Sequence, residues 1–469
     1  MSLPQTFSLL VLGQGSSGLD VVTWACRHLG ERVSSVTMYG GASSAPNDRT
    51  RELEAAGAVF VYGTERVEGS YDVCVASPGI SEFCDFFAAG RDHSAQIMGE
   101  PEFSWRLSPD NWCAITGTNG KTTTTSLINH LLESAGMKSA AVGNIGTPAI
   151  NLVDGREEGS WFCAELSSYQ IATTFELHPR VAVLLNITDD HLAWHRSHEN
   201  YALAKIRLFQ NMDVDDLVIV DVDDAGNMAY RDQIFMPGRR VLSLSIEDPA
   251  TDDAAFVRAG HLVVRLGRVE HDLVAADELK IAGEHNVVNA LAAAAAALAC
   301  GADADDVRAG LLSFSPLEHR IEPAGSIDGV RYFNDSKATN TDAVEKALTA
   351  FPSDRVILLL GGYDKGTPLE DFSHVVCAGV TCVVCFGEAR ERFCEALSAA
   401  NQDGKVDILR AEHLRDAVDT ARAYAQEGDV VLFSPACSSF DEFSGYEERG
   451  RVFKAYLDEL LATANSTKR

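Results

Sequence analysis

The sequence predicts an α/β protein of three consecutive domains: a Rossmann-like N-terminal domain (1–100), a central P-loop-type domain with a parallel sheet (101–317) and a Rossmann-like C-terminal domain (318–469). Its length of 469 residues suits about three domains. Short apolar runs alternate along the chain with stretches of helical periodicity, which is typical of parallel sheets. Glycine-rich turns follow two of these runs, at 13–18 and 117–120, as in nucleotide-binding α/β folds.

The composition argues against several classes of protein. Hydrophobic residues make up 46% and charged residues 23% of the chain, as in ordinary globular domains, and the net charge is −29. That charge argues against nucleic acid or an anionic membrane surface as a partner. No apolar run is long enough to span a bilayer, and the alanine-rich run 290–300 is expected to be a buried helix. We expect a monomer that does not insert into membranes.

The N-terminal residues and the cysteines indicate the compartment. The first residues lack the basic segment and the long apolar core of a signal peptide, so we expect a cytoplasmic protein. The 11 cysteines are odd in number and scattered, which favours reduced thiols. Cys382 and Cys385 have the spacing of a redox or metal motif, but they fall in an apolar run without a second pair nearby. We therefore expect them to lie in a buried strand.

In the first domain, a predicted strand at Phe7–Leu12 leads into the glycine-rich turn and then into a helix. An NAD-binding domain also needs an acidic residue at the end of its second strand to hold the ribose hydroxyls. The predicted second strand, Val33–Tyr39, ends without one, so we interpret the turn as the seat of a phosphate or diphosphate of another nucleotide. Ser77 follows a third strand, Tyr71–Ala76, and should face the same crevice. Residues 99–109 are expected to form the exit linker.

The central domain carries the most informative segment, Gly117-Thr118-Asn119-Gly120-Lys121-Thr122-Thr123. A predicted strand, Trp112–Thr116, precedes it, and a helical stretch, 124–133, comes after it. The glycine backbone and the helix N-terminus suit an anion, the lysine can reach terminal phosphates, and the Thr122 hydroxyl can ligate Mg²⁺. The segment therefore predicts a nucleoside triphosphate site. The common P-loop has glycine where Ile115 stands, so this loop is of a shorter variety.

Two further predicted strands of the central domain, 161–166 and 181–187, end in polar residues. Glu165 lies at the end of the first, and the segment 186–191, which ends in His191, follows the second. Because the carboxyl ends of parallel strands meet at one edge of a sheet, these residues should face the phosphate loop. Glu165 could instead be an acid at a helix start, and His191 an ordinary loop histidine; their shared edge favours a metal or nucleotide role. Residues 213–274 are rich in strands and turns, and no chemistry is evident there.

The C-terminal domain repeats this arrangement. Strands are predicted at 330–333, 355–360, 381–386 and 429–433, with helical stretches between them. Polar clusters follow three of these strands, at 334–340, 361–365 and 434–439. Any one cluster could be a helix cap or a tight turn. Three clusters at one edge, two of them with a lysine, indicate a pocket for an acidic small molecule.

With these motifs in place, the chain resembles the Mur ligase family over nearly its whole length. The resemblance rests on the short phosphate loop and on signatures further along: Gly143-Asn144-Ile145-Gly146, Glu165-Leu-Ser-Ser-Tyr, Asp190-His191, Lys205, His285-Asn286 with Asn289, and His319-Arg320. Two longer segments are similar to the branch of the family that adds D-glutamate: Asn334-Asp-Ser-Lys-Ala-Thr-Asn340 and Ser434-Pro-Ala-Cys-Ser-Ser-Phe-Asp-Glu-Phe443.

The resemblance implies an ATP-dependent ligase of cytoplasmic peptidoglycan precursor synthesis. D-glutamate would be added to UDP-N-acetylmuramoyl-L-alanine through an acyl phosphate, because a free carboxylate is a poor electrophile. Two Mg²⁺ ions would offset the phosphate charge. One alternative is another amide-forming ligase of the superfamily, either a different Mur ligase or a folylpolyglutamate synthase. A P-loop ATPase regulator is a second, and it would leave the clusters of the third domain unexplained.

The resemblance also implies roles for individual residues. Catalytic roles fall to Lys121, Lys205, His191 and Lys337. One Mg²⁺ would be bound by Thr122 and Glu165, and the second by His191 and a carbamylated Lys205, whose carbamate oxygens suit an ion that prefers oxygen. ATP would be bound by Gly117, Thr118, Asn119, Gly120, Lys121, Thr122, Thr123, Asn286, Asn289, Arg320 and Asp335. The other substrates would be bound by Ser16, Ser17, Ser77, Asn144, Thr339, Lys365, Ser439 and Tyr446.

Two positions depart from the family pattern. Tyr39-Gly40 stands where a Thr-Arg type pair is common, so the resemblance assigns no uracil contacts there. Tyr363 stands between Gly362 and Asp364-Lys365, where some members have Gly-Asp-Gly-Lys.

Overall fold

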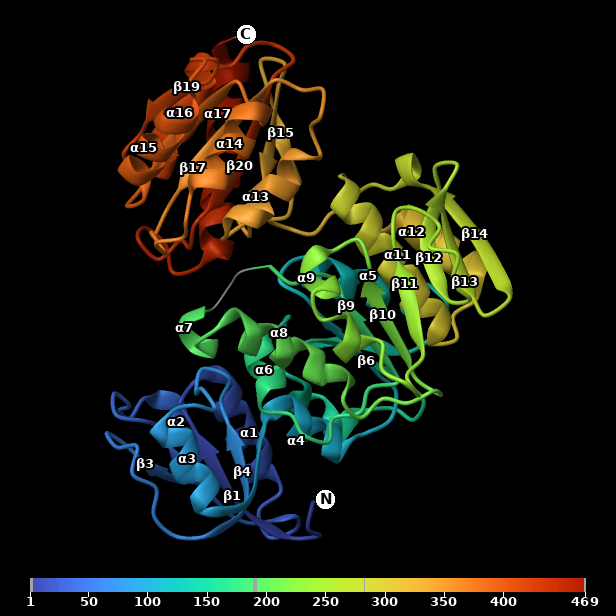
Figure 1. Cartoon of the computed structure of the whole chain (residues 1–469). Helices are drawn as coiled ribbons and strands as arrows, with labels where there is room; N and C mark the ends of the chain where they lie inside the picture. The colour runs from blue at the N-terminus through green and yellow to red at the C-terminus, as the bar shows by residue number, and fades with distance from the viewer. Residues whose placement is uncertain (1–2, 189–191, 282, 468–469) are drawn as a thin grey trace. The chain divides into compact units, whose positions relative to one another are not determined.

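The computed structural model of the chain describes residues 3–188, 192–281 and 283–467. Three sheets succeed one another along these residues, and the colour in Figure 1 runs through them from blue to red. By their internal contacts the residues form two compact units, 1–278 with 288–313, and 279–287 with 314–469. The first two sheets belong to the first unit and the third sheet to the second. The predicted fold class is confirmed, whereas the domain boundaries at 100 and 317 stay a prediction.

The first sheet is parallel, with strand order β3-β2-β1-β4-β5. Its elements are β1 (Phe7–Leu12), β2 (Val33–Tyr39), β3 (Val59–Val61), β4 (Tyr71–Ala76), β5 (Ser94–Gly99), α1 (Ser16–Arg27), α2 (Asp48–Ala55) and α3 (Asp85–Asp92). Leu9 and Val11 share a core with α1, whereas Leu10 and Leu12 pack with the phenylalanines of α3. Alternate residues of β1 therefore face opposite helix layers, as a strand buried on both sides requires.

Residues 99–109 are not a linker, so this prediction was wrong. They contain helix α4 (Glu100–Leu107), with Gly99 as its N-cap and Pro101 in its first turn. A proline at this place favours a helix start because its fixed φ is helical and the amide it lacks would be unpaired anyway. Glu100 and Glu102 are 1% and 0% exposed, so α4 is part of the packed interior of the first unit.

The central sheet has the strand order β14-β13-β12-β11-β10-β9-β6-β8-β7. Its strands are β6 (Trp112–Thr116), β7 (Ser139–Gly143), β8 (Trp161–Glu165), β9 (Val181–Leu184), β10 (Leu217–Asp221), β11 (Val241–Leu244), β12 (Ala254–Arg258), β13 (His261–Leu266) and β14 (Val269–Ala275). The strands from β7 to β12 run parallel, whereas β12, β13 and β14 pair antiparallel. The strand-rich segment 213–274 therefore adds an antiparallel edge to the expected parallel sheet.

The helices of this part vary in length. They are α5 (Lys121–Ser134), α6 (Ser168–Ala172), α7 (Leu192–His195), α8 (His198–Ile206), α9 (Ala225–Met228), α10 (Arg231–Ile234), α11 (Glu284–Ala299) and α12 (Ala304–Ser313). The alanine-rich run lies in α11, where every residue from 290 to 297 is fully buried, as expected. None of the helices in the described part of the chain is long and apolar enough to cross a membrane.

The third sheet has the strand order β15-β16-β20-β17-β18-β19, parallel except for β15. Its elements are β15 (Glu322–Ile327), β16 (Val330–Asn334), β17 (Val356–Gly361), β18 (Cys382–Phe386), β19 (Asp407–Arg410), β20 (Val430–Ala436), α13 (Thr341–Leu348), α14 (Glu370–Gly379), α15 (Arg390–Ala400), α16 (Leu414–Tyr424) and α17 (Tyr446–Thr467). Leu358 and Leu360 of β17 pack with α13, α14 and α15, and Ile357 and Leu359 with α16 and α17. This sheet is therefore doubly wound.

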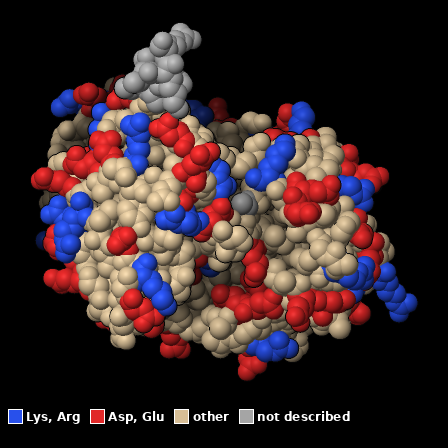
Figure 2. All heavy atoms as spheres, turned by 90° about the horizontal axis from the view of Figure 1, so that it is seen from above, with Lys and Arg blue, Asp and Glu red and all other residues tan. Residues whose placement is uncertain are grey.

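The cysteines and the surface charge agree with the sequence. All 11 cysteines are free, and Cys382 and Cys385 are buried in β18. On the face shown in Figure 2, acidic side chains lie interspersed with lysines and arginines, without a continuous basic area. The buried strand that the sequence predicted for the two cysteines is confirmed.

Glu102→Ala should lower the free energy of unfolding of the first unit by about 3 kcal/mol. The Glu102 carboxylate pairs with Arg106 and accepts hydrogen bonds from the amides of Phe175 and Glu176, and all three would lose this partner. Urea unfolding followed by tryptophan fluorescence measures the change. Glu158→Ala, at an exposed position of the same unit, should change it by no more than about 0.5 kcal/mol. Equal effects of the two substitutions would contradict the role given to the buried pairing.

Candidate active site

The phosphate loop connects the end of β6 to the first residue of α5. Gly117 and Gly120 have φ values of 155° and 83°, which other residues rarely adopt. A Cβ atom on Gly120 would lie 2.5 Å from Oδ1 of Asn289. Gly120 is the N-cap of α5, and no side chain among the described residues caps this helix. Backbone amides at an uncapped helix N-terminus form an arrangement that binds anions.

Two lysines meet at one carbonyl oxygen of this loop. Nζ of Lys121 donates to the carbonyls of Gly117 and Thr118, at 2.9 and 2.6 Å, and Nζ of Lys205 donates to that of Gly117 at 2.7 Å. Lys205 comes from α8, is 1% exposed, and has its ammonium 4.6 Å from the centre of the Tyr201 ring. The structure therefore brings two of the predicted catalytic cations together beside the anion-binding loop.

The end of β9 holds the loop in place. The Asn186 carbonyl accepts a hydrogen bond from the amide of Thr118 at 2.9 Å, and its side-chain oxygen accepts one from the amide of Asn119 at 2.8 Å. The Thr118 hydroxyl lies 2.9 Å from the hydroxyl of Tyr201. No separate role was predicted for Asn186 from the sequence, although its place at the end of the predicted strand 181–187 was a signal. Nothing in the sequence singled out Tyr201.

Glu165 lies at the end of β8, next to β6 in the sheet. Its Oε1 accepts a hydrogen bond from the side chain of Asn144 at 3.1 Å, whereas its buried Oε2 has no hydrogen-bond partner among the described residues. A buried carboxylate oxygen without a partner is rare and suits an ion ligand, and Mg²⁺ prefers carboxylate and hydroxyl oxygens. Glu165 and the buried Thr122 therefore fit Mg²⁺. The other predicted ligand, His191, lies outside the described residues.

The first sheet places its predicted substrate residues at two neighbouring strand ends. At the start of α1, Ser16 is exposed and Ser17 is half-buried. Ser77 follows β4, and its hydroxyl donates to the carbonyl of Gly13 at 3.0 Å. A Cβ atom on Gly18 would lie 2.3 Å from the same carbonyl, so the glycine allows α1 to approach the turn closely. The turn and Ser77 thus share one edge, as predicted.

In the second unit, Asp335 is buried at the end of β16. Its carboxylate accepts hydrogen bonds from the hydroxyl of Ser434 at 2.6 Å and from the amide of Ile321 at 3.2 Å. Burial raises the pKa of Asp335 to about 7, although the hydrogen bond from Ser434 and the charge of Arg320 both lower it. Of the two asparagines predicted to bind ATP, Asn286 is 8% exposed in this unit, whereas Asn289 accepts a hydrogen bond from the Thr124 hydroxyl in the first unit.

Three loops of the third sheet meet at the predicted D-glutamate residues. Nζ of Lys365 donates to the carbonyl of Thr339 at 2.8 Å, which joins the loop after β17 to the loop after β16. Lys337 has its ammonium 5.1 Å from the centre of the Tyr446 ring. Ser439 is 2% exposed in the loop after β20. The structure thus brings residues of all three predicted clusters to one edge of the sheet.

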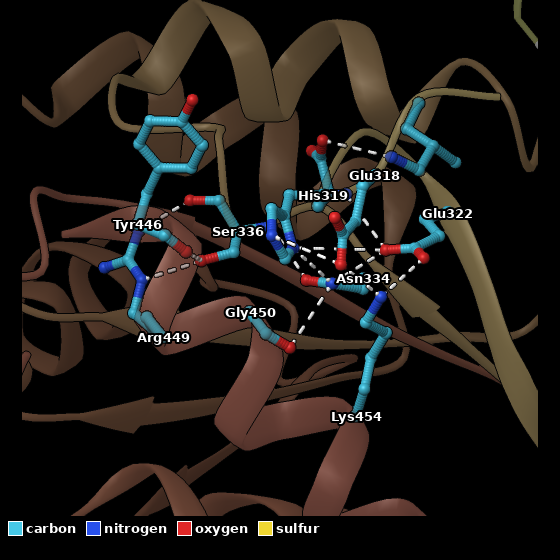
Figure 3. A network of polar contacts seen from close by, with 11 residues as sticks. Glu318, His319, Glu322, Asn334, Ser336, Tyr446, Arg449, Gly450 and Lys454 are labelled. Carbon is cyan, nitrogen blue, oxygen red and sulfur yellow. Dashed lines mark hydrogen bonds and ion pairs between the residues drawn. The ribbon is translucent and has the colours of Figure 1, made fainter. Parts of the chain in front are cut away.

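Arg449 of α17 is a residue that the sequence did not single out. It is fully buried, and its guanidinium donates to the carbonyls of Ser336, Cys437 and Ser438 at 2.8 to 3.0 Å and to the Ser336 hydroxyl at 3.1 Å. Burial lowers its pKa to about 10. Figure 3 shows the side chain beside Ser336. Arg449 therefore joins the loops after β16 and β20, which are far apart in sequence. Its guanidinium supplies the hydrogen bonds that water would otherwise donate to their carbonyls.

Three α/β sheets in series, with a glycine-lysine loop after one strand, define a large α/β protein with a loop of the phosphate-binding type. The model of the Mur ligase middle domain matches residues 115–297, and that of the Mur ligase glutamate ligase domain matches residues 319–437. The chain belongs to the Mur ligase family.

Two curated relatives cover almost the whole chain. The protein from Thermoanaerobacter pseudethanolicus is 35% identical over 96% of this chain and 98% of its own length. That from Acidobacterium capsulatum is 38% identical over 95% of each chain. Both carry the name UDP-N-acetylmuramoylalanine–D-glutamate ligase.

Solved structures share the fold at lower identity. UDP-N-acetylmuramate-alanine ligase MurC from Thermotoga maritima is 17% identical, with a TM-score of 0.56 over 97% of this chain and 100% of that chain. MurF from Acinetobacter baumannii is 15% identical, with a TM-score of 0.60 over 95% and 93%. Folylpolyglutamate synthase from Mycobacterium tuberculosis, solved with ADP and AMPPCP, is 16% identical, with a TM-score of 0.56 over 74% and 92%. These similarities support the fold.

The buried carboxyl of Asp335 should make stability depend on pH. Between the usual aspartate pKa of about 4 and the raised value of about 7, the native state keeps a proton that the unfolded chain has lost. The free energy of unfolding should therefore fall as the pH rises through this interval, by up to about 1.4 kcal/mol per pH unit from this group. Asp335→Asn keeps the shape of the side chain but removes the ionisable carboxyl. Its free energy of unfolding, measured in urea over this pH range, should therefore lack the part of the pH dependence that comes from Asp335.

Asp371→Asn, at an exposed position of α14, is the matched control and should keep the wild-type slope. Parallel curves for the wild type and Asp335→Asn would show that Asp335 is ionised in the folded protein throughout this range.

Proposed function

We propose that the protein catalyses the ATP-dependent addition of D-glutamate to UDP-N-acetylmuramoyl-L-alanine in cytoplasmic peptidoglycan precursor synthesis. The observation that carries this proposal is the full-length similarity to two D-glutamate ligases, at 35% and 38% identity. The nucleotides bound to folylpolyglutamate synthase, which has a similar fold, support ATP as the energy source. The loops joined by Arg449 and Lys365 support an amino-acid site in the second unit.

The reaction has two steps. The carboxylate of the muramoyl-alanine substrate attacks the terminal phosphorus of ATP, which forms an acyl phosphate and releases ADP. The amine of D-glutamate, after it loses a proton to solvent, attacks the acyl carbon, and phosphate leaves with the electrons of its C–O bond. Lys121 would lie against the transferred phosphoryl group, where a fixed positive charge stabilises the transition state. The amides at the start of α5 would hold the remaining phosphates of ATP.

We assign the magnesium ions to residues beside the phosphate loop. Thr122 and Glu165 would hold one ion, whose charge offsets that of the phosphates. Lys205, as a carbamate, and His191 would hold the second. The position of Lys205 supports this assignment, because its Nζ is buried within hydrogen-bond distance of the loop carbonyl of Gly117. An uncharged lysine can capture CO₂, and a bound metal would stabilise the anionic carbamate that forms.

The remaining assignments are divided between the two units. The UDP end of the substrate would be bound by Ser16, Ser17 and Ser77, with Asn144 nearer the reacting end. ATP would also contact Asn286, Asn289, Arg320 and Asp335. D-glutamate would be bound by Lys337, Thr339, Lys365, Ser439 and Tyr446. Two lysines suit this substrate because its two carboxylates need opposing charges.

Phosphate release should require both UDP-N-acetylmuramoyl-L-alanine and D-glutamate, and Lys121→Ala should lower turnover at least about 10²- to 10³-fold with the fold intact. A coupled phosphate assay and circular dichroism measure the two properties. Lys138→Ala removes a largely exposed lysine from the same unit and should leave turnover unchanged. Phosphate release without D-glutamate would indicate a P-loop ATPase instead. Near-normal ligase activity of a folded Lys121→Ala protein would contradict the catalytic role proposed for the phosphate loop.

The carbamate on Lys205 should be visible without an activity measurement. Protein saturated with Mg²⁺ and ATP in carbon-13 bicarbonate should give a carbamate NMR signal, because a bound metal traps the anionic product. The signal should be absent from Lys205→Ala and present in Lys138→Ala. Its absence from the saturated wild-type protein would contradict the carbamylated ligand.

A further inference from the structure

The turn that leads into the third sheet has an unusual backbone. His319 and Ile321 have φ values of 65° and 42°, on either side of Arg320. Left-handed values are uncommon for residues other than glycine, and for a β-branched residue such as Ile321 they are strained. Strain of this kind persists only where surrounding contacts impose it. Specific contacts must therefore hold this turn.

Glu322 and Lys454 supply these contacts. The Glu322 carboxylate accepts hydrogen bonds from the amide of His319 at 2.9 Å and from the side chain of Asn334 at 3.0 Å. Lys454 of α17 donates to Glu318 at 2.7 Å and to Glu322 at 2.8 Å. Partial burial lowers the pKa of Lys454, but its bonds to the two carboxylates outweigh this, and the pKa is raised. One lysine thus fastens both ends of the turn to the C-terminal helix (Figure 3).

The His319 ring fits between Asn334 and Gly450. Its Nδ1 lies 2.9 Å from the Asn334 side-chain nitrogen, which can only donate, so Nδ1 accepts and Nε2 carries the proton. Burial lowers the pKa of His319, although Glu318 and Glu322 raise it, which agrees with a neutral ring. A Cβ atom on Gly450 would lie 2.2 Å from Nδ1. Only glycine at this helical position leaves room for the ring.

The turn also holds residues to which we assign substrate contacts. The carbonyl of His319 accepts a hydrogen bond from the amide of Lys337 at 3.2 Å, and the amide of Ile321 donates to the Asp335 carboxylate. Arg320 stands between these two anchors. The same few residues therefore connect the ATP contacts Arg320 and Asp335 with the D-glutamate contact Lys337.

We infer that Glu322, Gly450 and Lys454 are positioning residues, which fix Arg320 and Lys337 relative to each other so that the ATP and amino-acid contacts of the second unit act as one rigid piece. This inference rests on the proposed function of those two residues. Helix α17, which begins at Tyr446, is then part of the catalytic arrangement, although we assign no substrate contact to Gly450 or Lys454.

Gly450→Ala is the sharpest test. Alanine favours a helix more than glycine does, so the substitution should not unfold α17, but its methyl group must displace His319. We expect kcat to fall and the KM values for ATP and D-glutamate to rise together, with kcat/KM lower by about 10- to 100-fold, as for a small misplacement of binding groups. Gly379→Ala in α14, where the nearest atom would be 3.7 Å away, is the matched control and should keep wild-type kinetics.

Lys454 provides an independent test. Lys454→Met keeps the length of the side chain but removes its charge and donors, so it should reproduce the rise in both KM values. Lys454→Arg keeps a charge and donors, so both KM values should be those of the wild type. Lys405→Met, which removes an exposed lysine paired with Asp403, should change neither. A purely structural role would lower the thermal midpoint and leave both KM values unchanged at temperatures where the protein is folded. That result, or a rise in only one KM, would overturn the inference.

Arg320→Ala and Lys337→Ala distinguish a failure of this inference from a failure of the substrate contacts on which it rests. If these variants raise the KM for ATP and for D-glutamate respectively while Gly450→Ala and Lys454→Met behave as wild type, the positioning role is wrong and the site assignments hold. If Arg320→Ala, Lys337→Ala and Lys365→Ala all keep wild-type KM values, the assigned pocket is wrong, and the positioning role falls with it.

Discussion

The direction of the parallel strands is the constraint on which the rest of this structure depends. Parallel strands all end at the same edge of a sheet, so the loops that follow them lie close together at that edge. Gly117, Glu165 and Asn186 lie at or just after the ends of three adjacent strands of the central sheet, and the hydrogen bond from the Asn119 amide to Asn186 follows from that adjacency. The third sheet does the same with Asp335, Lys365 and Ser439. The strand topology thus determines where functional side chains can lie close together, whatever their identity.

Features that depend on local pattern could mostly be predicted from the sequence. The apolar runs of the parallel core, the phosphate loop with α5 and the buried cysteines of β18 were evident from periodicity and turn residues, because each depends on neighbours in sequence. The short strands β3, β15 and β19 were missed, because three to six residues at a sheet edge carry little pattern. Helix α4 was missed because eight residues give little room for a helical pattern.

The parts of the site that could not be predicted depend on distant contacts. Arg449 resembles any surface arginine of an amphipathic helix until α17 packs against the loops after β16 and β20. Tyr201 and Gly450 acquire their importance in the same way, from a hydroxyl of the phosphate loop and from the His319 ring. Lys205 could be assigned only by resemblance, and the structure adds that its ammonium is buried at the loop. Burial of such charges is costly unless their donors find oxygens, and both the Arg449 guanidinium and the Lys205 ammonium donate to backbone carbonyls.

The place of β20 has a consequence for synthesis of the chain. This strand is the last in the sequence, yet it lies between β16 and β17 in the third sheet. Strands β16, β17, β18 and β19 therefore leave the ribosome without the partner that joins β16 to β17, and they expose apolar faces until residue 436 emerges. The first two sheets need no residue beyond 313 to complete their unit and can fold earlier. A nascent chain that stops before β20 would carry a folded first unit attached to an open, aggregation-prone sheet.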